Sequence, residues 1–217
     1  MALVADDVKS RRRYTSALRS EQARATRSAV LEAARKLFAE RGYAATGVAA
    51  IAERAGVAVD TVYATVGRKP VLLRAVLETA ISGVDEAVPA EERDYVHRIR
   101  AAETAREKLE LYAGAMAEIG PRLAPVHRAL AEAALTDADC AALHVEIRER
   151  RAANMRLFAA DLRATGELRP ELTDDEVADV VWSMNAPEYR ALFMERGWSA
   201  ERFDRWLADA WIRLLLR

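Results

Sequence analysis

The fold is decided by residues 46–69, which have the sequence TGVAAIAERAGVAVDTVYATVGRK. The stretch fits two short helices joined by a tight break at residues 55–57. Helices of one to two turns are not stable alone, so the pair needs particular residues where the two helix axes approach. Ala52 is small, Gly56 permits the positive φ of a sharp turn, and Val62 fills the space between the helices. This spacing predicts a helix-turn-helix, whose second helix enters the major groove of DNA.

The distribution of charge favours this interpretation over the alternative, an ordinary αα-hairpin inside a core. Residues 1–70 carry 13 basic and 7 acidic side chains, whereas residues 71–217 carry 20 basic and 27 acidic ones. The formal net charge of −1 therefore hides a basic N-terminal part. Such asymmetry suggests that one end of the chain meets a polyanion, although charge runs are commonly only solvated faces.

The composition indicates an all-α protein. Among 217 residues there are 46 Ala but only 9 Gly and 6 Pro, and Ala, Leu, Arg and Glu dominate. These are the strongest helix formers, and the scarcity of turn residues argues against a β-sandwich or barrel. The apolar spacing along the chain predicts about nine helices and no strand.

Capping and breaking residues predict where the main helices begin and end. We expect the first helix to begin at Ser20 and to end at Gly42. A long helix should end near residues 120–121, which are Gly and Pro. Thr173 followed by Glu176 forms a capping box, and Ser199 should cap the last helix.

Several functional classes lack support in the sequence. The single cysteine, Cys140, excludes an intrachain disulfide framework and fits a reducing cytoplasm. No apolar run is long enough for a membrane helix, and the N-terminus lacks the apolar core of a secretory signal. No Walker loop, G-x-S-x-G, HExxH or paired CxxC motif is present. Cys140 and His144 are four residues apart, but no third metal ligand is evident, so we expect no metal, no cofactor and no enzyme.

Residues 21–82 resemble the DNA-binding domain of the TetR (tetracycline-repressor-like) family. The matching pieces keep the family's order and spacing across about 60 residues. They are AARKLF at 33–38, RGY at 41–43, TGVAAIA at 46–52, AGV at 55–57, TVY at 61–63, GRK at 67–69 and LL at 72–73. The remainder resembles the family in length and helix count only.

The resemblance and the chemistry together assign DNA contacts to the helix pair. Thr46 should cap the first helix of the pair. Thr46, Tyr63 and Lys69 are expected to reach the phosphate backbone. Exposed positions of the second helix are candidates for base edges, and the DNA-binding candidates in full are Thr46, Val59, Asp60, Thr61, Tyr63, Ala64, Arg68 and Lys69. For Asp60 an equally good reading is a carboxylate that complements the helix dipole.

The chain departs from the family pattern in ways that affect DNA readout. Ala58 replaces a usual Ser or Thr cap, Val66 replaces a common aromatic residue, and the recognition helix has few of the usual base readers. DNA shape and arm contacts therefore gain weight. The basic arm at Arg11, Arg12 and Arg13 fits a minor groove, and the alternative is a disordered solubilising tail.

The resemblance also implies that the second half binds a small molecule and forms a two-fold dimer. Pocket candidates are aromatic, thioether and polar side chains on the central helices: Tyr112, Met116, Arg150, Asn154, Met155, Phe158, Trp182 and Tyr189. Dimer candidates lie on the two apolar helices near the C-terminus: Val181, Trp206, Trp211 and Leu214. The alternative for each of these side chains is a place in the core of one subunit.

The domain plan that results has three parts. Residues 1–19 form a flexible basic arm, residues 20–70 the helix-turn-helix domain, and residues 71–217 the helical effector-binding and dimerisation domain. We expect a cytoplasmic, homodimeric repressor that binds a palindromic DNA operator and is released by a small molecule. One rival is an effector-independent activator or DNA-binding protein, and another is a ligand-binding or enzymatic α-bundle.

Overall fold

The computed structural model describes the backbone of residues 3–84 and 86–217, and side chains from residue 19 onward. The chain divides into two compact units, residues 1–76 and residues 77–217. The division falls inside one continuous helix, α4 (Lys69–Ser82), rather than at residue 70, where we expected the DNA-binding domain to end.

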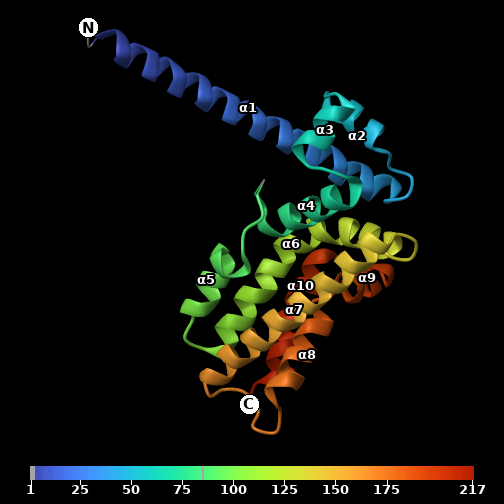
Figure 1. The fold of residues 1–217 in the computed structure, drawn as a ribbon. Coiled ribbons are helices and arrows are strands. Elements are labelled where there is room, and N and C mark those ends of the chain that lie inside the picture. The colour runs from blue at the N-terminus through green and yellow to red at the C-terminus, as the bar shows by residue number, and fades with distance from the viewer. Residues whose placement is uncertain (1–2, 85) are drawn as a thin grey trace. The chain divides into compact units, whose positions relative to one another are not determined.

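The all-α prediction is confirmed over the described residues, which form ten α-helices, one 3₁₀ turn and a single isolated β-bridge between Leu168 and Leu216. The helices of the N-terminal unit are α1 (Leu3–Arg41), α2 (Val48–Ala55), α3 (Val59–Thr65) and the first part of α4. Those of the C-terminal unit are α5 (Asp94–Ala101), α6 (Ala105–Ala133), α7 (Ala138–Ala164), α8 (Asp174–Met184), α9 (Pro187–Glu195) and α10 (Ala200–Leu215), after the 3₁₀ turn Ala90–Glu92 (Figure 1).

The N-terminal unit packs α1 against α2 and α3. The spacing of apolar residues on α1 predicted this face, and Val30, Ala34, Leu37 and Phe38 are all buried. The helix pair itself follows the predicted pattern, because Ile51, Ala52 and Val62 are buried between the helices. Gly56 has φ +70, and the amide of Val57 donates to Ala52 O at 3.0 Å, which closes the sharp turn.

The start of α1 differs from our prediction. The helix begins at Leu3, so Ser20 lies inside it and does not cap it. No glycine or proline interrupts residues 3–41, and the segment is rich in strong helix formers, so nothing local stops the helix. The side chains of the Arg11–Arg13 run lie outside the described residues, and their contact with DNA stays a prediction.

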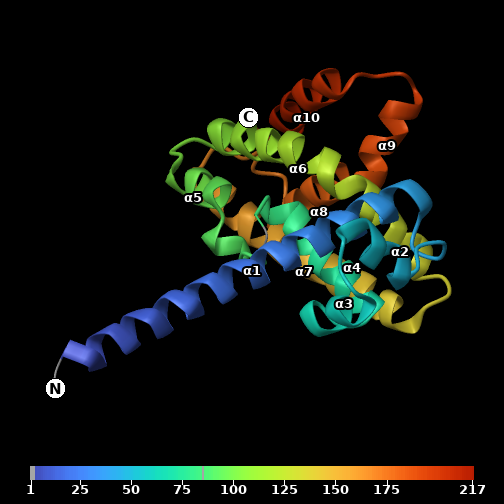
Figure 2. The ribbon, with the colours of Figure 1, turned by 90° about the horizontal axis from the view of Figure 1, so that it is seen from above.

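In the C-terminal unit, α6, α7, α8 and α10 run alongside one another as a bundle (Figure 1), and α10 lies beside α6 (Figure 2). Leu109, Leu162, Val177, Leu207 and Trp211 are almost fully buried in its core. Burial of such apolar surface is the main term that stabilises the bundle.

Side-chain caps begin four of these helices. The Thr173 hydroxyl accepts from Glu176 N at 3.2 Å while the Glu176 carboxylate accepts from Thr173 N at 2.7 Å, which confirms the capping box. Ser199 caps α10 as predicted, and Asp137 and Thr104 cap α7 and α6.

The prediction that a helix ends near Gly120 is wrong, because α6 continues through Pro121 and Pro125 to Ala133. Proline removes a backbone donor and usually breaks or kinks a helix. Here buried side chains lie on both sides of the prolines, including Ile119 and Val126, so packing outweighs the local preference.

Candidate functional site

The outward face of α3 carries the residues expected to meet DNA bases. Val59 and Tyr63 are 38% and 47% exposed, large values for apolar or aromatic side chains. Asp60 and Ala64 are exposed beside them, and Thr61 is half-buried. Val62 points the other way and is fully buried. The helix therefore packs on one face and leaves its other face free for a partner.

Lys69 begins α4 beside Tyr43. Its ammonium lies 4.0 Å from the centre of the Tyr43 ring, a cation–π contact, and that ring stacks on Phe38 at 5.8 Å between centroids. These contacts fix a positive charge at the helix start, next to exposed Arg68. Sequence reasoning assigned Lys69 but missed Tyr43, whose buried ring was matched only as part of the family pattern.

The hydroxyl and the amide of Thr46 form hydrogen bonds inside the N-terminal unit and are not directed toward a DNA phosphate. The side chain is fully buried, and its hydroxyl donates to Gly42 O at 2.7 Å and approaches Leu37 O at 3.1 Å. Its amide donates to Tyr43 O at 3.1 Å, and Gly47, not Thr46, caps α2. Thr46 therefore ties the α1–α2 turn to α1, and we leave it out of the candidate interface.

Several basic side chains of the N-terminal unit are engaged within the unit. Arg54 of α2 forms a two-pronged ion pair with Glu40 of α1, with N–O distances of 2.7 and 3.0 Å, and this pairing lowers the pKa of Glu40. Arg27 donates to Thr65 O at 3.2 Å, which links α1 to α3. Part of the basic excess thus stabilises the helix arrangement.

The C-terminal unit contains a cavity of about 630 Å³. Its wall comes from the end of α4, from α5, α6 and α7, and from the α8–α9 junction. Six of the eight predicted pocket residues line it: Tyr112, Met116, Arg150, Asn154, Met155 and Phe158. These residues were expected there as aromatic, thioether and polar side chains of the central helices.

A polar network crosses the wall of this cavity. Asn185 Nδ2 donates to the Tyr112 hydroxyl oxygen at 2.6 Å, and Asn185 Oδ1 accepts from Arg151. Arg151 also donates to Trp182 O at 2.9 Å. Burial raises the pKa of Tyr112 and lowers the pKa of Arg151. The cavity thus joins apolar walls to a neutral phenol and a desolvated guanidinium, a combination that suits an apolar ligand with a polar group.

Sequence reasoning missed Arg151, Asn185 and His127 as cavity residues. Arg151 is the neighbour of a predicted residue, and Asn185 lies in the segment 185–187, which was interpreted only as a break between helices. Sequence reasoning also assigned two residues to the cavity, Trp182 and Tyr189, that lie elsewhere. Trp182 and Tyr189 do not line the cavity: Trp182 stacks near Arg151 and Arg148, while Tyr189 joins an aromatic cluster with Phe193, Phe203 and Trp206.

The four predicted dimer residues separate into two pairs. Val181 and Trp211 are buried to 1% and 0% exposure within one chain, so they belong to its core and not to a surface. Trp211 stacks on Tyr112 at 5.6 Å between ring centroids. Trp206 is only partly buried and Leu214 is 51% exposed, so these two remain on the surface of α10.

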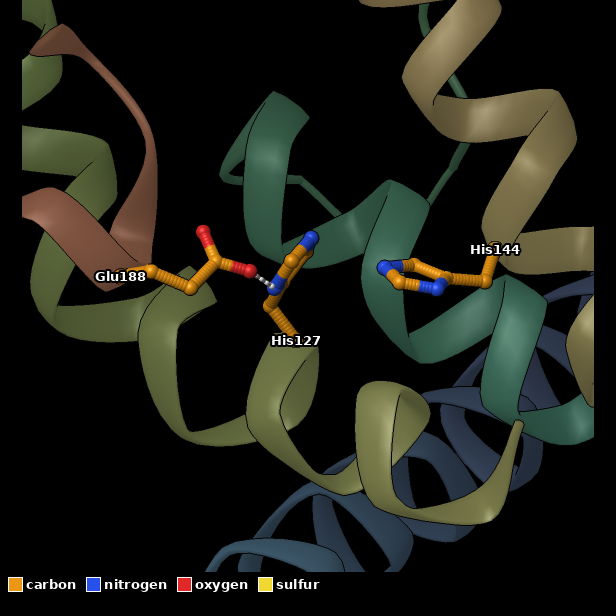
Figure 3. A group of neighbouring side chains, drawn as sticks. All are labelled: His127, His144 and Glu188. Carbon is orange, nitrogen blue, oxygen red and sulfur yellow. Dashed lines mark ion pairs between the residues drawn. The ribbon is translucent and has the colours of Figure 1, made fainter. Parts of the chain in front are cut away.

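Three potential metal ligands meet at one edge of the cavity region. His127, His144 and Glu188 come from α6, α7 and α9, and one ligand atom from each lies within 4.8 Å of the others (Figure 3). Burial lowers the pKa of His127. Cys140, the partner that we considered for His144, is buried and does not belong to this group.

Comparisons with known proteins agree with this picture. Residues 30–76 match the model of the bacterial regulatory proteins of the tetR family. No curated protein matches the chain in sequence. No helix among the described residues is long and apolar enough to cross a membrane.

Solved structures share the fold along most of the chain. NalD, the secondary repressor of the MexAB-OprM multidrug efflux pump in Pseudomonas aeruginosa, is 18% identical with a TM-score of 0.68, covering 90% of this chain and 98% of its own. A complex of SmeT with triclosan has 17% identity and a TM-score of 0.70, with coverage of 89% and 92%. A putative regulator from Saccharomonospora viridis in complex with choline has 18% identity and a TM-score of 0.66, with coverage of 88% and 97%. Residues 30–76 therefore match the tetR family of bacterial regulatory proteins, and the chain shares a TetR-like fold along most of its length.

Proposed function

We propose that the chain is a homodimeric repressor that binds a palindromic operator and releases it when a small molecule fills the cavity of the C-terminal unit. The observation that carries this proposal is the extent of helix α4, which reaches from the helix pair to the cavity. Its first residue is Lys69, and its last turns supply Leu77, Glu78 and Ile81 to the cavity wall. One continuous helix therefore belongs both to the DNA-binding unit and to the wall of a ligand-sized cavity.

The cavity supports a ligand of a particular class. Its volume of about 630 Å³ falls within the range of small-molecule sites, and its walls are largely apolar, with Ile99, Met116 and Phe158 among them. Four arginines also line it: Arg93, Arg100, Arg150 and Arg151. Three carboxylates, Glu78, Glu91 and Asp161, line it too, and Arg150 lies 3.7 Å from Glu78. An apolar molecule with a polar group fits this lining. Two proteins of this fold form complexes with small molecules, SmeT with triclosan and the Saccharomonospora viridis regulator with choline, which supports a small-molecule ligand for this chain.

Release follows from differential affinity. A ligand shifts an equilibrium only when it binds one conformation better than the other. A ligand that packs against Leu77 and Ile81 favours one position of α4, and Lys69 at the other end of the helix then moves with respect to its phosphate. DNA and ligand would weaken each other's binding by the same factor.

The test combines DNA selection with a ligand panel. We expect the full chain to enrich a two-fold symmetric site from a random DNA library and to protect it in a footprint as a dimer. A thermal-shift panel then identifies the effector, because a ligand at 100 times its dissociation constant adds about 2.7 kcal/mol to the stability of the protein. Addition of that effector should abolish the footprint.

The same measurements separate the rivals. A monomer on an asymmetric site contradicts the dimeric repressor. A symmetric footprint that no stabilising ligand alters favours an effector-independent DNA-binding protein. Loss of all DNA binding under heparin competition favours a ligand-binding or enzymatic α-bundle.

A further inference from the structure

His127 is a buried histidine with an unsatisfied nitrogen. The residue is 4% exposed, and its Nδ1 lies 3.4 Å from Glu188 Oε1. Its Nε2 is fully buried and has no hydrogen-bond partner among the described residues. A buried polar atom without a partner destabilises the fold, so a native protein normally supplies a partner for it.

The side chains around His127 have the chemistry of a metal site. In Figure 3, His127 stands between Glu188 and His144, and the three side chains come from three different helices. The rings of His127 and His144 meet edge to face, with their centroids 5.6 Å apart. Two imidazoles and one carboxylate form a ligand set that divalent zinc-class ions use in proteins.

The geometry requires only a small closure around an ion. An ion held about 2.0–2.2 Å from each ligand atom needs those atoms to lie about 3.5 Å apart. They now lie within 4.8 Å of one another, and the Glu188 side chain is 62% exposed, so it has room to move inward. His144 is only partly buried and can turn toward His127.

We propose that His127, His144 and Glu188 bind one divalent transition-metal ion, of the zinc and cobalt class, at the wall of the cavity. His127 lines that cavity, so the ion keeps a coordination position for a ligand or water on the cavity side. Arg148 and Arg151 add positive charge near His127, so the Glu188 carboxylate is the ligand that offsets the charge of the ion. The site does not depend on the repressor function proposed above.

Titration of tag-free full-length protein with Co²⁺ tests the site directly, followed by competition with Zn²⁺. We expect one Co²⁺ per chain, with visible absorption of a low-symmetry site that Zn²⁺ removes. His144→Ala and Glu188→Gln should each weaken Co²⁺ binding by at least about tenfold, since even loss of an outer-shell partner typically has that effect. His97→Ala is the matched control, because His97 is an exposed histidine of α5 outside the cluster.

Co²⁺ binding by the wild type and by the variants either supports or overturns the proposed metal site. Absence of Co²⁺ binding in the wild-type chain, equal binding by His144→Ala and Glu188→Gln, or loss of binding in His97→Ala would each overturn the proposal. Cys140→Ser should bind Co²⁺ like the wild type, because the buried thiol lies outside the cluster. Circular dichroism of every variant confirms the fold, and Glu188→Gln, at an exposed position, decides the question if His144→Ala is unstable.

Discussion

The two units of the chain place their polar side chains differently. In the N-terminal unit, Thr46 is the buried polar side chain among the described residues, and its hydrogen bonds are made within the unit. In the C-terminal unit, Lys108 and His127 are buried, and Arg151 and Asn185 form a network on a cavity wall.

This difference separates two ways to bind a partner. The N-terminal unit has a closed interior and offers its outer face, where Tyr63 and Arg68 are exposed. The C-terminal unit keeps polar groups inside, and Arg151, Asn185 and His127 line its cavity. A surface that meets a long polyanion and an interior that encloses a small ligand need these opposite arrangements.

The strongest test of the inward arrangement is Lys108→Met. The Lys108 ammonium donates to Asp161 Oδ2 at 2.9 Å and to Ile99 O at 2.9 Å, and the side chain is 4% exposed. Removal of Lys108 leaves the half-buried Asp161 carboxylate and the Ile99 carbonyl without this donor, so we expect a loss of about 2–3 kcal/mol in the free energy of unfolding. Urea denaturation measures it.

Arg54→Met is the control for that prediction. It removes one partner of the exposed Arg54–Glu40 pair, and it should change stability far less. Equal losses from the two substitutions would contradict the distinction between the units.

The closed interior of the N-terminal unit is tested by Thr46→Val. The substitution keeps the shape of the side chain but removes the donor to Gly42 O, and a lost buried hydrogen bond costs about 1–2 kcal/mol. Thr46→Ser retains the hydroxyl and should keep most of the stability. DNA affinity per folded molecule should be unchanged in both variants. A fall in affinity without a fall in stability would restore Thr46 to the DNA interface.

Most of the N-terminal unit could be predicted from sequence because its contacts are local. Ala52, Gly56 and Val62 lie within eleven positions of one another, and short helices leave few ways to pack them. Thr46 was misplaced because a threonine before a helix usually caps it. Here Gly47 takes the cap position, and the hydroxyl turns back to α1.

The C-terminal unit could be predicted only in part because its contacts join distant segments. Residue type on the central helices, together with the family resemblance, identified cavity residues such as Met116 and Phe158. It could not separate core from surface on α10, where Trp211 is buried and Leu214 is exposed three residues later. The approach of His127, His144 and Glu188 depends on the packing of three helices, and no spacing along the chain indicates it.

The outward face of the N-terminal unit is tested by Lys69→Ala. If Lys69 meets a phosphate, its loss should weaken binding to all DNA sequences alike and lower the slope of log affinity against log salt by about 0.9. Binding titrations at several salt concentrations measure the slope. Lys69→Arg keeps the charge and should keep the slope. An unchanged slope in Lys69→Ala would show that its contact with Tyr43 is purely structural.

The smallest effect is expected at Glu32, an outward carboxylate of α1. Glu32 accepts from Arg35 at 2.7 Å and lies 3.2 Å from Lys36, and these partners lower its pKa from 4.5 to about 2, with the Arg35 hydrogen bond as the largest cause. The folded state therefore binds a proton less readily than the unfolded state. The resulting stabilisation is present above about pH 5 and is lost as the pH falls toward 2.

The side chain of Glu32 is 46% exposed, so solvent screens both pairs and the contribution should not exceed about 1 kcal/mol. Urea denaturation of the wild type and of Glu32→Gln, from pH 7 down to pH 3, should show a small difference that shrinks with acidification. A difference that stays constant or grows in acid would mean that Glu32 acts through packing and not through its charge. A difference as large as that of Lys108→Met would mean that outward charges stabilise the N-terminal unit as strongly as inward ones stabilise the C-terminal unit.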